Sequence, residues 1–153
     1  MDYVISDASA RHLEALEELE KRCFSVPWTR EQLESQLPDE QHCFLVAESS
    51  GGELLGYVGM MLILDEGYIS NVAVAPAARR QGIADRLIAE LLRRAETLAL
   101  AFVTREVRAG NVPAIARYEK HGFRTVGLRR GYYEAPREDA LLMTKRLDEA
   151  KDI

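Results

Sequence analysis

Apolar residues recur three or four residues apart in four segments of the chain, which is the spacing of an amphipathic helix. The pattern predicts helices over residues 8–24, 29–37, 83–98 and 112–120. Thr29 followed by Gln32 is typical of a capping box at the start of the second helix. The third helix has the most regular inner stripe, made of Leu87, Ile88, Leu91 and Leu92.

Shorter apolar segments, bounded by Gly, Pro, Asp or Ser, predict strands over residues 3–6, 42–48, 54–64, 67–74, 102–108, 124–128 and 140–145. We expect tight turns at Ser49–Gly52 and Asp65–Gly67, and a polar loop over 131–138. The resulting order, β-α-α-β-β-β-α-β-α-β-β, predicts an α/β fold with a mixed sheet and helices on both faces. One domain over residues 1–147 and a short polar tail over 148–153 account for the chain.

Composition restricts the function classes. The 153 residues suit one domain, and a domain of this size buries a sufficient core without disulfides or metals. The net charge of -5 argues against broad nucleic-acid binding, which needs a basic face. Cys23 and Cys43 are far apart, and no Cys/His cluster has metal-ligand spacing. With no signal peptide and no membrane-length apolar segment, we expect a cytoplasmic location.

The strand that ends at Val74 leads through a basic loop directly into the third predicted helix. The N-terminus of a helix presents unpaired N–H groups and the positive end of the helix dipole, so it suits an anion such as a pyrophosphate. Gly82 allows a close backbone approach, Ala84 keeps the first turn small, and Arg79 and Arg80 add charge. The alternative is an ordinary connection with solvated arginines. The spacing matches neither a Walker loop nor a dinucleotide fingerprint.

The segment 79–84, Arg-x-x-Gly-x-Ala, resembles the acetyl-CoA signature of the GNAT N-acetyltransferase superfamily. Other segments resemble, in chain order, motifs of its RimI branch, which acetylates the N-terminal alanine of a small-subunit ribosomal protein. They are Pro27-Trp28, the Glu-Val-Arg-Ala-Gly-Asn run at 106–111, the Tyr-Glu-Lys-His-Gly-Phe helix end at 118–123, Arg130-Gly131-Tyr132-Tyr133 and the closing strand from Arg137.

The resemblance implies a GNAT fold with a mostly antiparallel sheet, acetyl-CoA as co-substrate and no metal. In the family, the strand before the loop splays from the next strand, the arm of the cofactor fills the gap, and backbone N–H groups stabilise the oxyanion. Carried onto this chain, the cofactor contacts are Val72, Ala73, Val74, Arg79, Arg80, Gln81, Gly82, Ile83, Ala84, Asp85 and Asn111. For Asn111 the alternative is a plain turn residue.

Two residues are candidates for proton transfer. Glu106 is the candidate base, because its neighbours Phe102, Val103 and Val107 suggest a buried strand in which the pKa of a carboxyl rises. The alternative is a structural ion pair with Arg105 or Arg108. A further candidate, Tyr118, is the general acid for the departing thiolate; the alternative, from its helical spacing, is a core aromatic residue.

The expected acceptor is the basic N-terminal segment of a ribosomal protein, whose terminal alanine amine takes the acetyl group by direct transfer in a ternary complex. Trp28, Tyr132 and Tyr133 are expected to wall the peptide groove. Acidic residues expected near its rim are Glu34, Asp39, Glu40, Asp65, Glu66 and Glu134. The alternative acceptors are another protein N-terminus, a lysine side chain or a small-molecule amine. We expect no direct nucleic-acid or membrane binding, and a monomer or weak dimer.

Overall fold

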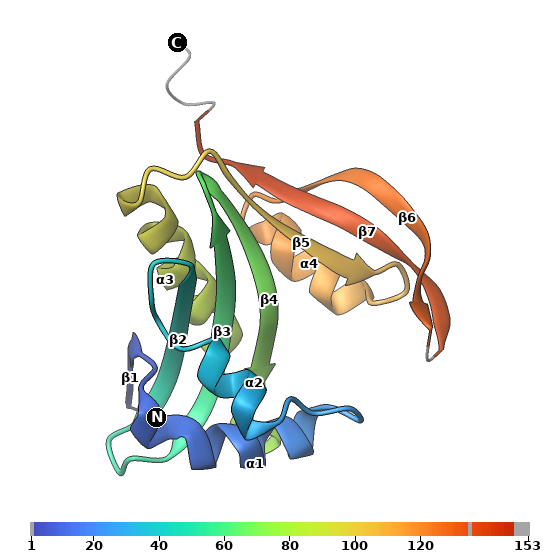
Figure 1. The fold of residues 1–153 in the computed structure, drawn as a ribbon. Coiled ribbons are helices and arrows are strands. Elements are labelled where there is room, and N and C mark those ends of the chain that lie inside the picture. The colour runs from blue at the N-terminus through green and yellow to red at the C-terminus, as the bar shows by residue number, and fades with distance from the viewer. Residues whose placement is uncertain (1, 135, 149–153) are drawn as a thin grey trace.

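The computed structural model describes residues 2–134 and 136–148. Its strands are β1 (Tyr3–Asp7), β2 (His42–Ser49), β3 (Leu54–Ile63), β4 (Glu66–Val74), β5 (Phe102–Arg108), β6 (Arg124–Glu134) and β7 (Arg137–Arg146). Its α-helices are α1 (Leu13–Cys23), α2 (Arg30–Ser35), α3 (Ile83–Thr97) and α4 (Val112–Lys120). Figure 1 shows one twisted sheet that carries helices on both sides, as the sequence predicts.

The seven strands form a single sheet in the order β1-β2-β3-β4-β5-β7-β6. Neighbouring strands run antiparallel except β4 and β5, which are parallel and are connected through α3. The parallel pair therefore divides the sheet into an N-terminal part, β1 to β4, and a C-terminal wing of β5, β6 and β7 (Figure 1).

Two adjacent residues of β3 show how the helices cover opposite faces. Side chains alternate between the faces of a strand. The hydroxyl of Tyr57 donates a hydrogen bond to Glu20 in α1, whereas a Cβ on Gly56 would lie 3.4 Å from Leu87 Cδ1 in α3. The two helices therefore enclose β3 between them.

Helix α3 forms because its apolar residues lie on one side. The predicted stripe is buried, with Leu87, Ile88 and Leu91 at 0% exposure. The helix begins after Gly82, whose left-handed backbone (φ 78°) ends the preceding loop. Burial of this stripe against the sheet supplies most of the stability of such a helix, and it fixes the position of its N-terminus over the end of β4.

The structure corrects the polar loop expected over 131–138. Tyr133 pairs with Glu138 and Glu134 with Arg137, so these residues extend the β6–β7 hairpin. Strand β6 is the outer strand of the sheet, and most of its side chains are exposed. An exposed edge strand needs no apolar alternation, so its sequence has the composition of a loop.

Element ends also differ by a few residues. The turn expected at Asp65–Gly67 lies at Leu64 and Asp65, because Glu66 already pairs with Ile63. Leu64 adopts φ 54°, a left-handed conformation that is uncommon for leucine, so the sequence did not indicate a turn at this residue. Helix α1 ends at Cys23, before Pro27, and starts after a 3₁₀ turn at Ala10–His12.

Beyond Asp148, the expected polar tail lies outside the described residues. Asp148 itself pairs with Arg146 (3.2 Å). Within residues 2–134 and 136–148, no helix is long and apolar enough to cross a membrane. The same part of the chain contains no group of three or more His, Cys, Asp or Glu side chains that could hold a metal ion.

Candidate functional site

The parallel strands β4 and β5 pair only at their beginnings. Glu66 pairs with Phe102, Gly67 with Val103 and Tyr68 with Thr104, and beyond these residues the ladder stops. The strands diverge there, and a cavity of about 900 Å³ occupies the gap. We call it the splay pocket; its walls are residues 71–74 of β4, residues 78–80 and 82 of the loop, the start of α3, residues 105–108 of β5, and α4.

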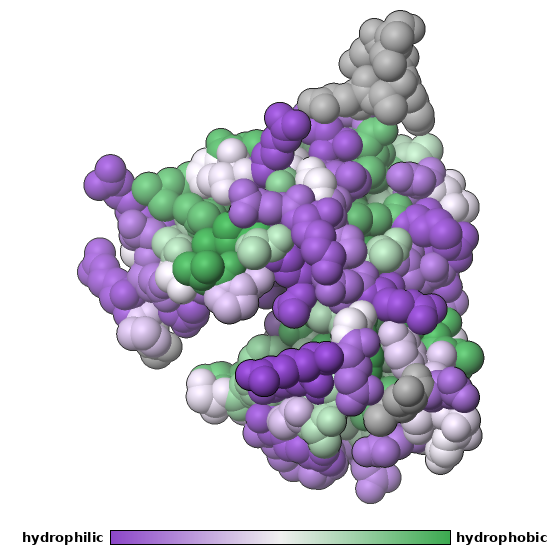
Figure 2. Space-filling view, turned by 180° about the vertical axis from the view of Figure 1, so that it is seen from behind, coloured by the Kyte–Doolittle hydropathy of each residue, from purple (hydrophilic) through white to green (hydrophobic). Residues whose placement is uncertain are grey.

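Figure 2 shows the surface deeply indented between the lobe that carries α4, β6 and β7 and the lobe below it. Both hydrophilic and hydrophobic residues lie around the indentation (Figure 2). A β-bulge lies close to the point of divergence, because the register with β3 shifts from Gly59↔Asn71 to Met60↔Ile69 and leaves Ser70 as the extra residue of β4. A free strand edge and a bulge together expose backbone groups of β4 to the pocket.

The loop before α3 borders one end of the pocket and leads into the N-terminus of the helix. Gly82 is the N-cap, and a Cβ there would meet no atom within 4 Å, so its backbone borders open space. The first intrahelical bond runs from Arg86 N to Gly82 O (3.1 Å). The N–H groups of Ile83, Ala84 and Asp85 therefore have no acceptor within the helix and are available to a ligand.

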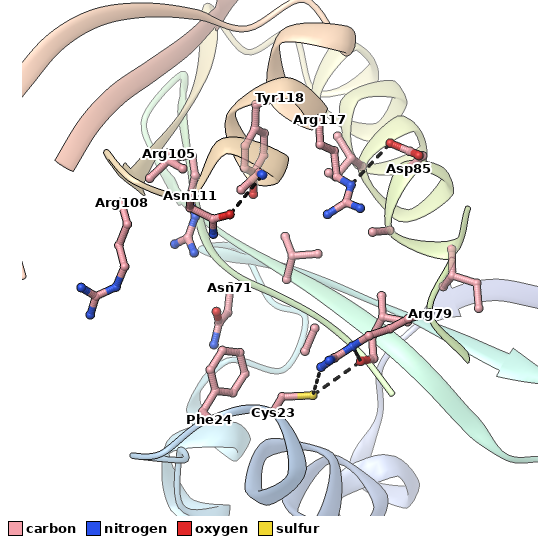
Figure 3. Close-up of a pocket in the computed structure, with 18 of the residues that line it drawn as sticks. Cys23, Phe24, Asn71, Arg79, Asp85, Arg105, Arg108, Asn111, Arg117 and Tyr118 are labelled. Carbon is pink, nitrogen blue, oxygen red and sulfur yellow. Dashed lines mark hydrogen bonds and ion pairs between the residues drawn. The ribbon is translucent and has the colours of Figure 1, made fainter. Parts of the chain in front are cut away.

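The two loop arginines differ in their surroundings. Arg79 turns back to the end of β4, where its Nε donates to Val74 O (3.1 Å) and its Nη2 lies 3.6 Å from Cys23 Sγ (Figure 3). It is thus part of the pocket wall. Arg80 is exposed, has φ 65° and also lines the pocket. Gln81 is not among the lining residues, in contrast to its neighbours on both sides.

Glu106 lies on the β5 wall, but it is less buried than the sequence suggests. Its side chain is 23% exposed, and one carboxylate oxygen lies 3.4 Å from Nε of Arg129 in β6. The expected partners Arg105 and Arg108 bind elsewhere: Arg105 to β4 and Arg108 to Glu138. Of its apolar neighbours, Val103 and Val107 lie on the opposite face of the strand, and Phe102, on the same face, is itself only half-buried.

Tyr118 in α4 is both a buried aromatic residue and a lining residue of the pocket. Its ring is buried and meets the ring of Phe123 edge to face at 5.2 Å, while the residue also lines the splay pocket. Burial raises the pKa of Tyr118, and the nearby guanidinium of Arg105 opposes this rise. The phenol therefore keeps its proton at neutral pH and can act as a donor.

Asn111 and Asp85 position α4 against the loop. Asn111 Oδ1 accepts a hydrogen bond from Ala114 N (3.2 Å), so the side chain is the N-cap of α4 as well as a lining residue (Figure 3). Asp85 bridges α3 to α4 through Lys120 and His121, each at 3.0 Å. Burial opposes ionisation of Asp85, but these two hydrogen bonds outweigh it and lower the pKa of that carboxyl.

The aromatic residues expected to bind the acceptor do not all reach the pocket. Tyr133 lines it, stacks edge to face with Tyr132 at 5.0 Å and lies under the guanidinium of Arg108 at 4.1 Å. Trp28 is not a lining residue; its backbone N–H donates to Glu20 (2.7 Å). None of the acidic residues expected near the groove lines the splay pocket, namely Glu34, Asp39, Glu40, Asp65, Glu66 and Glu134.

Several lining residues escaped the sequence analysis, notably Cys23, Phe24, Asn71, Arg105 and Arg117. Cys23 and Phe24 come from the end of α1, Asn71 from β4 and Arg105 from β5, so the pocket joins elements far apart in the chain (Figure 3). Neither Asn71 nor Arg105 carried a distinct signal, because each has polar neighbours in its own strand.

Comparison with known proteins agrees with this geometry. The model of the acetyltransferase (GNAT) family matches residues 13–123. A "putative [ribosomal protein bS18]-alanine N-acetyltransferase" of Bacillus subtilis is 30% identical over 132 residues, 86% of this chain and 87% of the relative. The "[ribosomal protein bS18]-alanine N-acetyltransferase" of Escherichia coli K12 is 33% identical over 141 residues, 91% of this chain and 94% of the relative.

Solved structures show the same fold. The crystal structure of the ribosomal-protein-S18-alanine N-acetyltransferase from Escherichia coli superimposes with a TM-score of 0.87 at 31% identity, covering 95% of this chain and 94% of that chain. Arabidopsis thaliana NAA60, crystallised in complex with acetyl-CoA, superimposes with a TM-score of 0.87 at 22% identity, covering 95% of this chain and all of that chain. At 22% identity, the similarity to NAA60 shows the fold alone.

Proposed function

Because the chain belongs to the acetyltransferase (GNAT) family, we propose that it transfers the acetyl group of acetyl-CoA to the N-terminal alanine amine of ribosomal protein bS18. The observation that carries this proposal is the splay pocket, which joins the unpaired N-terminus of α3 to the free edge of β4 and places Glu106 and Tyr118 on its other walls. The named relatives at 30% and 33% identity support the acceptor.

The pocket residues fit acetyl-CoA. The N–H groups of Ile83, Ala84 and Asp85 would hold the pyrophosphate, since Gly82 leaves the approach to them open. The free backbone edge of Val72, Ala73 and Val74 would pair with the amides of the pantetheine arm, as an added strand would. Arg79 shapes the wall at Val74, and exposed Arg80 adds positive charge near the phosphates.

The reaction forms a C–N bond and breaks the C–S bond of the thioester. An α-amino group titrates near ~8, so a mild base is sufficient to remove its proton. Glu106 serves as that base, directly or through water, because its carboxylate is accessible. Backbone N–H groups of the free β4 edge stabilise the oxyanion. Tyr118 then gives its proton to the departing thiolate, which leaves as the CoA thiol.

The acceptor site lies at the mouth of the pocket beside the wing. Tyr133 borders it, and the exposed ring of Tyr132 packs edge to face against Tyr133. The net charge of -5 favours encounter with a basic peptide, so we expect the rate to fall as salt rises. Ribosomal proteins are made and assembled in the cytoplasm, which we propose as the site of action.

An acceptor panel tests the proposal. Release of CoA is measured with a peptide that carries the bS18 N-terminus beginning with alanine, with the same peptide blocked at its α-amine, with peptides bearing internal lysines, and with small amines. We expect turnover only with the free α-amine. Faster turnover of lysine peptides or small amines would contradict the acceptor and leave the acetyltransferase activity in place.

A further inference from the structure

We propose that Arg105 is a positioning residue for the transfer reaction proposed above: its guanidinium fixes the β4 backbone at the point where β4 and β5 diverge and places a positive charge on the wall of the pocket that Tyr118 also lines. The proposal rests on the proposed function. Neither the sequence motifs nor the comparisons assign a role to this residue.

The first observation is the position of Arg105 in the sheet. Tyr68↔Thr104 is the last pair of the parallel ladder, and Arg105 is the next residue of β5. Its Nη1 donates to Ser70 O (2.9 Å) and lies 3.3 Å from Ile69 O. In a continuing sheet, backbone N–H groups of the neighbouring strand would bind such carbonyls at a strand spacing of about 4.8 Å. Here a long side chain makes the bond across a wider gap.

The second observation is what this bond fixes. Ser70 is the extra residue of the β4 bulge, and Asn71, the next residue, lines the pocket. Asn71 is held from the other side, because its Nδ2 donates to the hydroxyl of Tyr57 (3.1 Å). Arg105 and Tyr57 therefore fix the bulged segment between them, at the edge where backbone N–H groups face the pocket.

The third observation links Arg105 to the candidate acid. Arg105 and Tyr118 line the same pocket from β5 and α4 (Figure 3). Burial raises the pKa of Tyr118, and the positive charge of Arg105 acts in the opposite direction. The other cation that acts on the phenol is Arg117, and it lies 3.7 Å from Asp85. The Arg105 charge favours the phenolate that remains after proton transfer.

Packing alone does not explain an arginine here. Its Nε is buried and has no hydrogen-bond partner among the described residues. A buried donor without a partner is destabilising, and an apolar side chain of similar volume often serves a structural role equally well. The guanidinium is better explained by its action on the two groups that it reaches, the bulge of β4 and the phenol of Tyr118.

A double-mutant cycle tests the proposal. Arg105→Met, Tyr118→Phe and the double variant are compared for kcat and for the KM of acetyl-CoA, with Arg105→Lys as the conservative variant. We expect Arg105→Met to lower kcat by ~10-fold or more, and Arg105→Lys to restore most of the loss. In the Tyr118→Phe background, the same change should lower kcat by a clearly smaller factor, because only the effect of Arg105 on the β4 backbone remains. Equal losses in both backgrounds would overturn the action of Arg105 on Tyr118, and an unchanged kcat in Arg105→Met would overturn the whole role.

A titration that needs no acceptor separates this proposal from the proposed function. The tyrosinate absorbance of Tyr118, obtained as the difference between each protein and its Tyr118→Phe partner, is followed with pH. Loss of the Arg105 charge should move this titration to higher pH, and Arg105→Lys should move it less. An unchanged titration in a folded Arg105→Met protein would overturn the proposal even if the acceptor were identified correctly. If the titration shifts as expected but no acceptor is acetylated, the result would count against the proposed function alone.

Discussion

The hydroxyl of Tyr57 in β3 donates a hydrogen bond to the carboxylate of Glu20 in α1, and both side chains are almost fully buried. The other Glu20 oxygen accepts the backbone N–H of Trp28 (2.7 Å), and the Tyr57 oxygen accepts from Asn71 in β4 (3.1 Å). One buried network thus ties the segment after α1 to the strand that borders the splay pocket.

Removal of the Tyr57 hydroxyl should therefore destabilise the fold. Tyr57→Phe leaves one Glu20 oxygen and the Asn71 amide without their partner, and an unsatisfied buried group costs about 1–3 kcal/mol. Urea denaturation measures the loss. Tyr68→Phe is the matched control, because the Tyr68 hydroxyl also donates to a carboxylate, that of Glu66, but in a more exposed place. We expect a change of less than about 0.5 kcal/mol there; equal losses would contradict the importance of the network.

Substitution of Gly82 should weaken acetyl-CoA binding by more than the backbone strain explains. Gly82→Val places a β-branched side chain at φ 78°, over N–H groups that the proposal assigns to the pyrophosphate. We expect affinity to fall by ~10-fold or more in calorimetry. Gly52→Val is the control, since Gly52 has φ 84° and open space around it but lies in the β2–β3 hairpin turn. Equal affinity of Gly82→Val and Gly52→Val for acetyl-CoA would contradict a phosphate site at Gly82.

Replacement of Glu106 should lower turnover and leave cofactor binding intact. Glu106→Gln keeps the shape of the side chain but cannot accept a proton, so we expect kcat to fall by ~10²-fold with little change in acetyl-CoA affinity. Arg129→Gln is the matched variant, because it removes the ion-pair partner (3.4 Å) and leaves the carboxylate. If Glu106 is the base, kcat should fall much less in Arg129→Gln than in Glu106→Gln. Similar losses of kcat in both variants would mean that Glu106 contributes through its ion pair with Arg129 and not as a base.

The pattern of apolar residues was sufficient to predict most of the fold. Strand Phe102–Arg108 and helix Val112–Lys120 agree with the prediction to the residue, because the turn at 109–111 and Gly122 mark their ends. The β6–β7 hairpin could not be predicted over 131–138, since strands at the sheet edge keep polar residues on both faces. Its pairing depends on the neighbouring strand rather than on local propensity.

Candidate site residues could be proposed from the sequence where they lie within one segment. The glycine loop, Glu106 and Tyr118 follow from local motifs, and the structure brings them to one pocket. Arg105 and Trp28 did not follow, because their surroundings depend on where β4 and β5 diverge and how the segment after α1 packs. No local pattern encodes contacts between residues so far apart in the chain.

The fold should also lose stability in acid through Glu48. Both carboxylate oxygens accept from Arg11 at 2.9 Å, and His12 lies 3.3 Å away. These hydrogen bonds, led by that of Arg11 and opposed by burial, lower the pKa of Glu48 to about 2. An unfolded glutamate titrates near ~4.3, so the stabilisation is complete above that pH and is lost as the pH falls towards 2.

Thermal unfolding of Glu48→Gln tests this dependence. We expect the variant to melt below the wild type at pH 7, and the difference in Tm to shrink as the pH falls from about 4 to 2. Glu53→Gln, an exposed change in the same hairpin, should melt with the wild type throughout. A difference for Glu48→Gln that is independent of pH would contradict the assignment to ionisation.

The most direct test of the acetyl-transfer account is mass spectrometry of intact bS18 incubated with this protein and acetyl-CoA, followed by peptide mapping of the product. The account predicts a single acetyl group on the α-amine of the N-terminal alanine, absent when Glu106→Gln replaces the wild type for the same time. An unmodified N-terminus, or acetyl groups on lysine side chains at a higher yield than on the terminal amine, would contradict it.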